Sequence, residues 1–380
     1  MQSRKQNIKI FKLVLINLFI FSAMLIIFET AGYFGRIILD KTDIGWLYKN
    51  PNNILEEHPC VVMKTHPIFS HVPDHRNKCN IRGGYALETY VFYGDKKSIN
   101  YPAIVTLGGS TTSGFYQHYA NGFTYPYWLS KLLKDYKIQV INGGHGGYSS
   151  SEELLKLLLE VRAFKYQTPI ILSLNGINDL ILQSENNPFI PHRVQQMYAM
   201  QEWINQGFLP NFFPNIWSFI KYFSPQIESQ VYDSKIKPDH AIFKQVDPVE
   251  IWEKNIKAMY SISKSEGLEY FTFLQPTMGL DGPQSKLPAD QKSNDFIMLQ
   301  ELLEGKIEEG YESWYLKLLN DKYKKMKIIC SNLDFCHDIS DIASPKGNFY
   351  SNPRHHNENG NKIIAMAILS ILKQESIYFN

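Results

Sequence analysis

From Tyr101 onward, short runs of β-branched or apolar residues alternate with longer stretches of helical period. The short runs predict strands, which lie at 103–107, 138–141, 169–174 and 270–274. The longer stretches predict helices, which lie at 124–133, 154–164, 249–263, 312–325 and 360–372. Ser150 opens the sequence Ser-Ser-Glu-Glu and is expected to cap the second helix. Strands that alternate with helices predict an α/β domain with a parallel sheet and crossover helices.

The N-terminus has a different pattern, a cationic flank followed by an apolar run. Four lysine or arginine residues precede the run 13–28, in which only Asn17 and Ser22 are polar. This run is shorter than the ~20 residues that span a bilayer, but 10–11 and 30–34 can extend the helix at the interfaces. No small-x-small cleavage site follows, which favours an uncleaved signal anchor over a cleaved signal peptide. The basic flank then stays cytoplasmic, and the chain from about 35 onward is extracytoplasmic.

These patterns divide the chain into three segments. We expect a cytoplasmic flank and signal anchor at 1–34, a loop-rich stalk or cap at 35–100, and an α/β domain at 101–380. Within the domain the alternation fails at about 181–248, where aromatic residues and prolines crowd together. This indicates an insertion, either a lid or acyl-binding surface or a packed structural element.

Charge and histidine spacing exclude some classes of partner. Lys+Arg is 39 against Asp+Glu 37, so the net charge of +2 gives no electrostatic reason to expect nucleic acid. The histidines before Tyr101, His66 and His71 among them, show no recurring metal-ligand spacing, and no C-x-x-C pair is present. The sequence therefore predicts neither a nucleic-acid partner nor a metal site.

Four cysteines lie beyond the apolar run, an even number in what is expected to be an oxidising compartment. Pairing Cys60 with Cys79, and Cys330 with Cys336, would close two short loops. The alternative is that the four are buried free thiols, because sequence alone does not fix connectivity.

Three predicted strands end in turns of small or polar residues, at 108–112, 143–147 and 175–179. In an open parallel sheet such turns gather at the carboxyl edge, where ligands bind. Ser110 in the first turn can act as a nucleophile if a base reaches it; the alternative is an N-cap serine without chemistry. Phosphate binding is disfavoured, because no lysine follows in the G-x-x-x-x-G-K-[ST] spacing.

The candidate base is His355, which stands on a loop just before the last predicted helix, with His356 beside it. From that position a histidine can fold back onto the carboxyl edge of the sheet. Taken alone, either histidine is more typical of a surface position.

Together these motifs resemble the SGNH/GDSL hydrolases, a family of serine esterases and acyltransferases. Gly-Gly-Ser at 108–110 resembles the first block of the family, and 142–147 resembles the second. Gly-Ile-Asn-Asp at 176–179 matches the third block, and His355 matches the histidine of the last. The resemblance implies a flavodoxin-like three-layer α/β/α sandwich with a mostly parallel sheet, the SGNH hydrolase fold, here preceded by an N-terminal transmembrane helix.

The resemblance also implies roles for particular residues. Ser110 would attack an ester carbonyl with His355 as its base. The backbone amides of Ser110 and Gly147 and the side-chain amide of Asn178 would hold the developing oxyanion. A serine mechanism of this kind needs no metal and no cofactor.

The chain departs from the family pattern at two positions. Gly109 stands where the family usually has aspartate before the serine, and Asn352 stands where it has the acid that orients the histidine. An asparagine oxygen can hold the imidazole ring but cannot stabilise imidazolium by charge. The group that orients His355 is therefore open: Asn352, a backbone carbonyl, Asp338 or Asp341.

The expected function is that of an extracytoplasmic, single-pass membrane esterase. It would remove O-acyl groups from a cell-envelope glycan or lipid through a Ser-His mechanism. One alternative is an O-acyltransferase that places acyl groups onto a polysaccharide. Another is a non-catalytic SGNH domain that binds glycan, which the asparagine at 352 motivates.

Overall fold

The computed structural model describes residues 2–41, 62–66, 70–74, 84–87, 90–93, 101–114, 124–163, 170–182, 247–278, 294–303, 319–342 and 348–379. These residues belong to two compact units, one with the N-terminal helix and one with all later elements. The insertion expected at about 181–248 falls almost wholly outside the described residues, as do Cys60 and Cys79.

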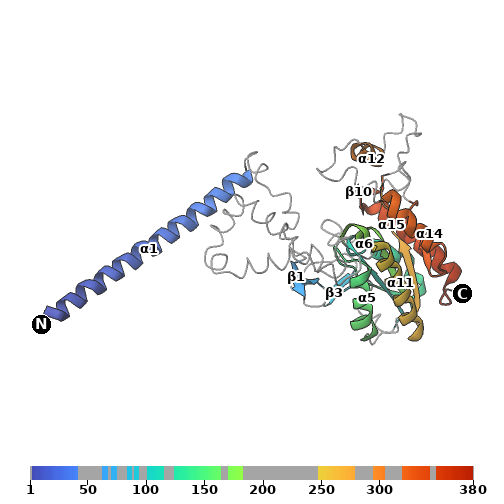
Figure 1. Ribbon diagram of the computed structural model, residues 1–380, viewed down its shortest axis with the longest axis horizontal. Helices are drawn as coiled ribbons and strands as arrows, with labels where there is room; N and C mark the ends of the chain where they lie inside the picture. Colours follow the sequence, from blue (N-terminus) through green and yellow to red (C-terminus); the bar gives the residue numbers. More distant parts are fainter. Residues whose placement is uncertain are drawn as a thin grey trace. The chain divides into compact units, whose positions relative to one another are not determined.

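The first unit contributes the helix α1 (Gln2–Lys41), which Figure 1 draws in blue. No proline interrupts its sequence. The stretch Leu15–Gly35 is long and apolar enough to cross a membrane, and little of it is buried in the protein. A signal sequence would pass the same test of length and composition. The anchor and its orientation therefore stay predictions.

The second unit is built on a seven-stranded sheet in the order β3-β4-β6-β5-β7-β8-β9. The strands are β3 (Gly84–Leu87), β4 (Tyr90–Tyr93), β5 (Ala103–Gly108), β6 (Gln139–Asn142), β7 (Ile170–Asn175), β8 (Glu269–Leu274) and β9 (Cys336–Asp338). The five strands from β6 to β9 are parallel, whereas β4 is antiparallel to both β3 and β6. Numbered along the chain, the parallel strands lie in the order 2-1-3-4-5, which confirms the predicted flavodoxin-like fold.

Helices cover both faces of the sheet, as expected for strands buried on two sides. They are α4 (Tyr125–Leu132), α5 (Ser150–Leu159), α6 (Ile177–Leu182), α11 (Pro248–Ser265), α14 (Lys324–Cys330) and α15 (Glu358–Glu375). In β7, Ile171 packs toward α5, α6, α11 and α14. Its neighbours Ile170 and Leu172 pack toward α4 and α15 on the opposite face. Figure 1 shows α5 and α11 side by side.

The predicted strands and helices agree with the observed ones within a few residues, with one correction. Helix α5 is capped by Ser149 rather than Ser150. The Ser149 side chain and Glu152 form a capping box, with the Glu152 carboxylate accepting from the Ser149 N–H at 2.9 Å. The sequence offers three consecutive serines at 149–151, and the first has the extended backbone that an N-cap requires.

Several further elements complete the unit. The helix expected at 312–325 is described from residue 319, as a π-helical turn η5 (Leu319–Tyr323) that continues into α14. The sequence did not predict helix α12 (Asn294–Leu303) or strand β9. Short helical turns are α3 (Ser110–Ser113), η3 (Lys134–Tyr136) and η4 (Val161–Ala163).

The stretch 35–100, expected to be loop-rich, contains four strands among its described residues. Strands β1 (Val62–His66) and β2 (Ser70–Asp74) pair with each other, and β3 and β4 extend the central sheet. In β4 every residue is buried. Part of this segment is thus structurally continuous with the α/β domain, while its division from the domain at residue 100 stays a prediction.

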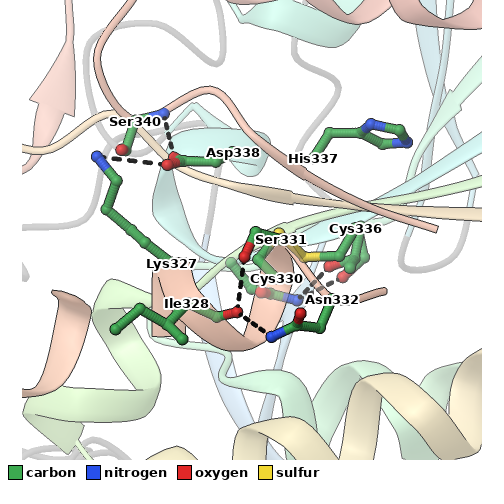
Figure 2. Close-up of a disulfide and its surroundings, with 12 residues drawn as sticks. Lys327, Ile328, Cys330, Ser331, Asn332, Cys336, His337, Asp338 and Ser340 are labelled. Carbon is green, nitrogen blue, oxygen red and sulfur yellow. Dashed lines mark hydrogen bonds and ion pairs between the residues drawn. A yellow bond between two sulfur atoms is a disulfide. The ribbon is translucent and has the colours of Figure 1, made fainter. Parts of the chain in front are cut away.

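A disulfide joins Cys330 to Cys336, as one of the predicted pairings requires. Figure 2 shows it linking the end of α14 to the start of β9. In the same segment Asp338 accepts from the backbone N–H of Ser340 at 3.0 Å and pairs with Lys327 at 3.3 Å. The edge strand of the sheet is therefore fastened to the helix before it.

Replacing Trp252 with phenylalanine is expected to destabilise the domain. The Trp252 Nε1–H donates to Asn175 Oδ1 at 2.7 Å, and both side chains are buried. Without that donor a buried acceptor loses its partner, which costs about 1–3 kcal/mol of the free energy of unfolding. Urea unfolding of the full chain measures the loss. The control on the same helix is Lys257→Ala, which removes an exposed ion pair and should change stability by less than about 0.5 kcal/mol. Equal stability of the two variants would contradict this account.

Candidate active site

Ser110 follows the carboxyl end of β5, two residues after Gly108, the last residue of the strand. Gly108 and Gly109 form a sharp turn between the strand and the serine. The turn requires glycine at position 108, because φ there is +149° and a Cβ would overlap the side chain of Thr112 and the carbonyl of Leu174. The short helix α3 begins at Ser110 itself. This turn leaves the Ser110 hydroxyl at the edge of the sheet.

His355 reaches Ser110 from the far end of the chain. Its Nε2 lies 2.6 Å from Ser110 Oγ. The histidine stands on β11 (His355–His356), which pairs with β10 (Tyr350–Asn352) through an irregular register. Contacts between described residues fasten this hairpin to the sheet edge. The Met278 N–H donates to the Pro353 carbonyl at 3.0 Å, and the Arg354 carbonyl accepts from Gln275 Nε2 at 3.4 Å and from Thr111 Oγ1 at 3.5 Å.

Asn352 supplies the group that faces the other nitrogen of the ring. Its Oδ1 lies 2.9 Å from His355 Nδ1. The same oxygen accepts the backbone N–H groups of Arg354 and His355, both at 3.0 Å. Because both backbone groups are donors, the atom of Asn352 that faces them must be its amide oxygen. The NH₂ group of the side chain has only hydrogens to donate and could not accept from them. The oxygen in turn requires hydrogen on Nδ1, which leaves Nε2 as the acceptor for the Ser110 hydroxyl.

The other candidates for this position lie elsewhere. Asp338 is engaged by Lys327 and the Ser340 N–H, and Asp341 is exposed to solvent. His356 is buried, and its ring packs against Tyr350 with centroids 4.7 Å apart. Among the described side chains, Asn352 is therefore the one that contacts His355 Nδ1. Sequence reasoning saw the asparagine at the acid's position but could not see the two N–H groups that fix its orientation.

Gly147 and Asn178 follow the two strands that flank β5 in the sheet. Gly147 follows β6 and has φ +78°, a conformation that favours glycine. Asn178 follows β7, and its Nδ2 donates to the Tyr148 carbonyl at 2.8 Å. An amide nitrogen carries two hydrogens, so this bond leaves the second available to a ligand.

The departure at Gly109 has a steric cause in this chain. A Cβ at position 109 would overlap Asn178 Nδ2 and come within 3.0 Å of the Tyr148 carbonyl. Asn178 thus occupies the space that a side chain at 109 would need. In this conformation the glycine before Ser110 leaves room for the Asn178 amide.

A buried carboxylate holds the third motif in place. Asp179 accepts the Ser150 N–H at 3.0 Å, the Ser150 hydroxyl at 2.5 Å and the Gly176 N–H at 3.3 Å. The Asp179 carboxylate thereby joins the turn after β7 to the first residue of α5. Burial raises the pKa of Asp179 to about 6, against the opposing effect of the Ser150 hydrogen bonds.

In the part of the chain that the structure describes, no group of three or more His, Cys, Asp or Glu residues could hold a metal ion. Among the described residues, a histidine nitrogen lies within hydrogen-bond distance of the Ser110 hydroxyl, and an asparagine oxygen faces the other nitrogen of that ring. This donor set suits acyl transfer through a serine rather than metal coordination.

No family model matches the chain, and no curated protein matches it. Solved structures do match. A structure described as a lipolytic protein of the G-D-S-L family from Desulfitobacterium hafniense is 12% identical, with a TM-score of 0.37; the match covers 71% of this chain and 99% of that one. An acetylxylan esterase from Geobacillus stearothermophilus, a catalytic mutant, is 13% identical with a TM-score of 0.37, covering 72% and 95%. The lipase/acylhydrolase from Enterococcus faecalis is 13% identical with a TM-score of 0.39, covering 72% and 96%.

The first of these structures is described as a member of the G-D-S-L family, which is the family that the sequence motifs resemble.

Placing an alanine at position 109 is expected to lower the reactivity of Ser110. The added Cβ would push Asn178 Nδ2 from its place beside the serine and weaken its bond to Tyr148. We expect the rate of Ser110 labelling by a fluorophosphonate to fall at least tenfold, on the order of the effect of losing an oxyanion donor. The matched control is Gly267→Asn, at a positive-φ glycine where a Cβ meets no neighbour. Labelling of Gly109→Ala at the rate of the control would show that the site tolerates a side chain there.

Proposed function

We propose that this protein is a serine esterase that removes O-acyl groups from a cell-envelope glycan or lipid on the extracytoplasmic side of a membrane. The observation that carries the proposal is the chain of contacts from Ser110 Oγ to His355 Nε2, at 2.6 Å, and from His355 Nδ1 to Asn352 Oδ1, at 2.9 Å. A binding domain without chemistry has no need for a serine and a histidine in this arrangement.

In the first half of the reaction Ser110 Oγ attacks the carbonyl carbon of the ester. Its proton passes to His355 Nε2, which lies within hydrogen-bond distance. Negative charge then develops on the carbonyl oxygen. The N–H groups of Ser110 and Gly147 and the second hydrogen of Asn178 Nδ2 are the donors proposed to hold it. His355 returns the proton to the departing alcohol, leaving an acyl-serine.

In the second half, water attacks the acyl-serine with His355 again as base. The imidazolium that forms in each half faces a neutral amide oxygen instead of a carboxylate. Asn352 therefore holds the ring in the tautomer that catalysis needs but adds no charge stabilisation. We expect a working enzyme that is slower than one with aspartate at this position.

The proposed location and substrate rest on features away from Ser110. Helix α1 contains a stretch long and apolar enough to span a membrane. The Cys330–Cys336 disulfide is typical of oxidising compartments. An enzyme fixed to the outer side of a membrane meets envelope glycans and lipids rather than cytosolic metabolites, which supports an O-acylated envelope component as substrate.

The direct test is covalent capture of Ser110 by a fluorophosphonate in the full-length protein, purified in detergent. We expect one adduct, located on Ser110 by peptide mass spectrometry, together with hydrolysis of p-nitrophenyl acetate. Ser110→Ala should lose both, and Ser113→Ala, its neighbour in the same helical turn, should lose neither. A wild-type protein that forms no adduct and hydrolyses no ester would refute the proposal.

Restoring an acid at position 352 is expected to increase turnover. An aspartate can accept the same three N–H groups and adds a negative charge beside the imidazolium. We expect kcat of Asn352→Asp to rise about tenfold. An Asp-to-Asn exchange in a serine protease triad lowers kcat by roughly four orders of magnitude, but there the histidine is also left in the wrong tautomer.

The matched variant is Asn352→Leu, which has a similar size and no acceptor. It should lower kcat by at least tenfold, because nothing then fixes the ring of His355. Steady-state rates on p-nitrophenyl acetate distinguish the three proteins. If the leucine variant is as active as the wild type, Asn352 does not orient the base.

A further inference from the structure

The loop after β6 is almost without side chains. It reads Gly-Gly-His-Gly-Gly over 143–147 and ends on Gly147, a proposed oxyanion donor. Glycine has more backbone freedom to lose than any other residue, so such a segment needs restraints to hold one N–H in place. Within it, His145 is the one residue whose side chain can act as a restraint.

His145 is anchored on both sides. Its backbone N–H donates to the Gly108 carbonyl at 2.9 Å, in the turn that precedes Ser110. Its ring is 2% exposed and meets Tyr148 edge to face, with centroids 4.7 Å apart. Its Nε2 lies 3.0 Å from Lys156 Nζ.

Lys156 is a buried cation on α5, with 1% of its surface exposed. Its Nζ lies 3.0 Å from Glu160 Oε2 and 4.0 Å from the centre of the Tyr90 ring. The Tyr90 hydroxyl donates to the same Glu160 carboxylate at 2.5 Å. An ammonium group has only hydrogens to offer, so it must donate to His145 Nε2 and the ring must carry its proton on Nδ1.

We propose that Lys156 and His145 are positioning residues for the esterase, and that their hydrogen bond holds the glycine loop so that the Gly147 N–H points at the oxyanion. This inference rests on the proposed function. Neither residue touches the reacting atoms. Lys156 acts through His145, and His145 acts through the backbone that it shares with Gly147.

The burial of Lys156 disfavours its charged form, and its partners offset this effect only in part. Burial lowers its pKa to about 8, and the neighbouring Glu160 opposes this shift only in part. Because the pKa of Lys156 is lower in the folded protein than in the unfolded chain, the folded protein gains stability as pH rises above about 8. Below that pH, folding disfavours the charged form of the lysine. Replacing the lysine also takes a donor from His145 Nε2 and from the Glu160 carboxylate, so the thermal midpoint must be measured alongside the rate.

Three variants of the full-length protein separate positioning from folding. His145→Phe keeps a ring against Tyr148 and removes the acceptor. His145→Gln places an amide oxygen near the former Nε2 and keeps it. Lys156→Met keeps the unbranched chain and removes the donor. Lys257→Met, on the exposed face of α11, is the control.

We expect kcat for p-nitrophenyl acetate to fall at least tenfold in His145→Phe and in Lys156→Met, with KM changed less than twofold. The double variant should be no slower than the slower single variant, because both remove one interaction. His145→Gln should recover most of the rate. Thermal midpoints of all the variants are measured as well, and rates are compared at a temperature where each variant is folded, so that a loss of kcat reports positioning and not unfolding.

Two results would overturn the inference while leaving the proposed function standing. One is wild-type kcat in His145→Phe or Lys156→Met. The other is an equal loss of kcat in His145→Gln and His145→Phe, which would mean that the acceptor is irrelevant. Failure of the proposed function itself is seen separately, as a wild-type protein whose Ser110 takes no fluorophosphonate.

Discussion

The position of the candidate site is set by the topological switch point of the sheet, where the strand order reverses at β5. Strand β5 starts the parallel sheet, β6 adds on one side and β7 on the other, and the helices that follow β5 and β7 pack on opposite faces. This arrangement opens a crevice at the carboxyl ends of the strands. Ser110, Gly147 and Asn178 follow β5, β6 and β7 and so must gather there. Only His355 has to be delivered separately, by the β10–β11 hairpin before α15.

At that crevice, the amide of Asn352 separates two functions that a carboxylate performs together. Its oxygen is held by two backbone N–H groups, so the amide cannot turn its NH₂ toward His355 without losing both bonds. Orientation of the base is thereby retained, while charge stabilisation is not. In a triad where asparagine is free to present its NH₂, the base is left in the wrong tautomer as well. The local backbone therefore decides what an asparagine at this position costs.

Much of the fold and of the candidate site could be predicted from the sequence. Apolar runs that alternate with helical stretches indicate strands buried on both faces of a parallel sheet, and glycine-rich turns after those strands mark its carboxyl edge. The motifs around Ser110, Asn178 and His355 were visible for that reason. Three features were not. β9 is too short to show a period, the steric demand of Asn178 on Gly109 depends on residues 69 positions apart, and the buried Lys156 under the glycine loop reads in sequence as an ordinary surface lysine of an amphipathic helix.

The central claim is that Asn352 holds His355 as the neutral tautomer with hydrogen on Nδ1. Nitrogen NMR of full-length protein labelled with ¹⁵N-histidine in detergent tests it directly, with His355→Gln used to assign the resonances. At a pH where His355 is neutral, the account predicts a protonated, pyrrole-type signal for Nδ1 and an unprotonated, pyridine-type signal for Nε2. The opposite assignment, with hydrogen on Nε2, would contradict it, because His355 could not then accept the proton of Ser110.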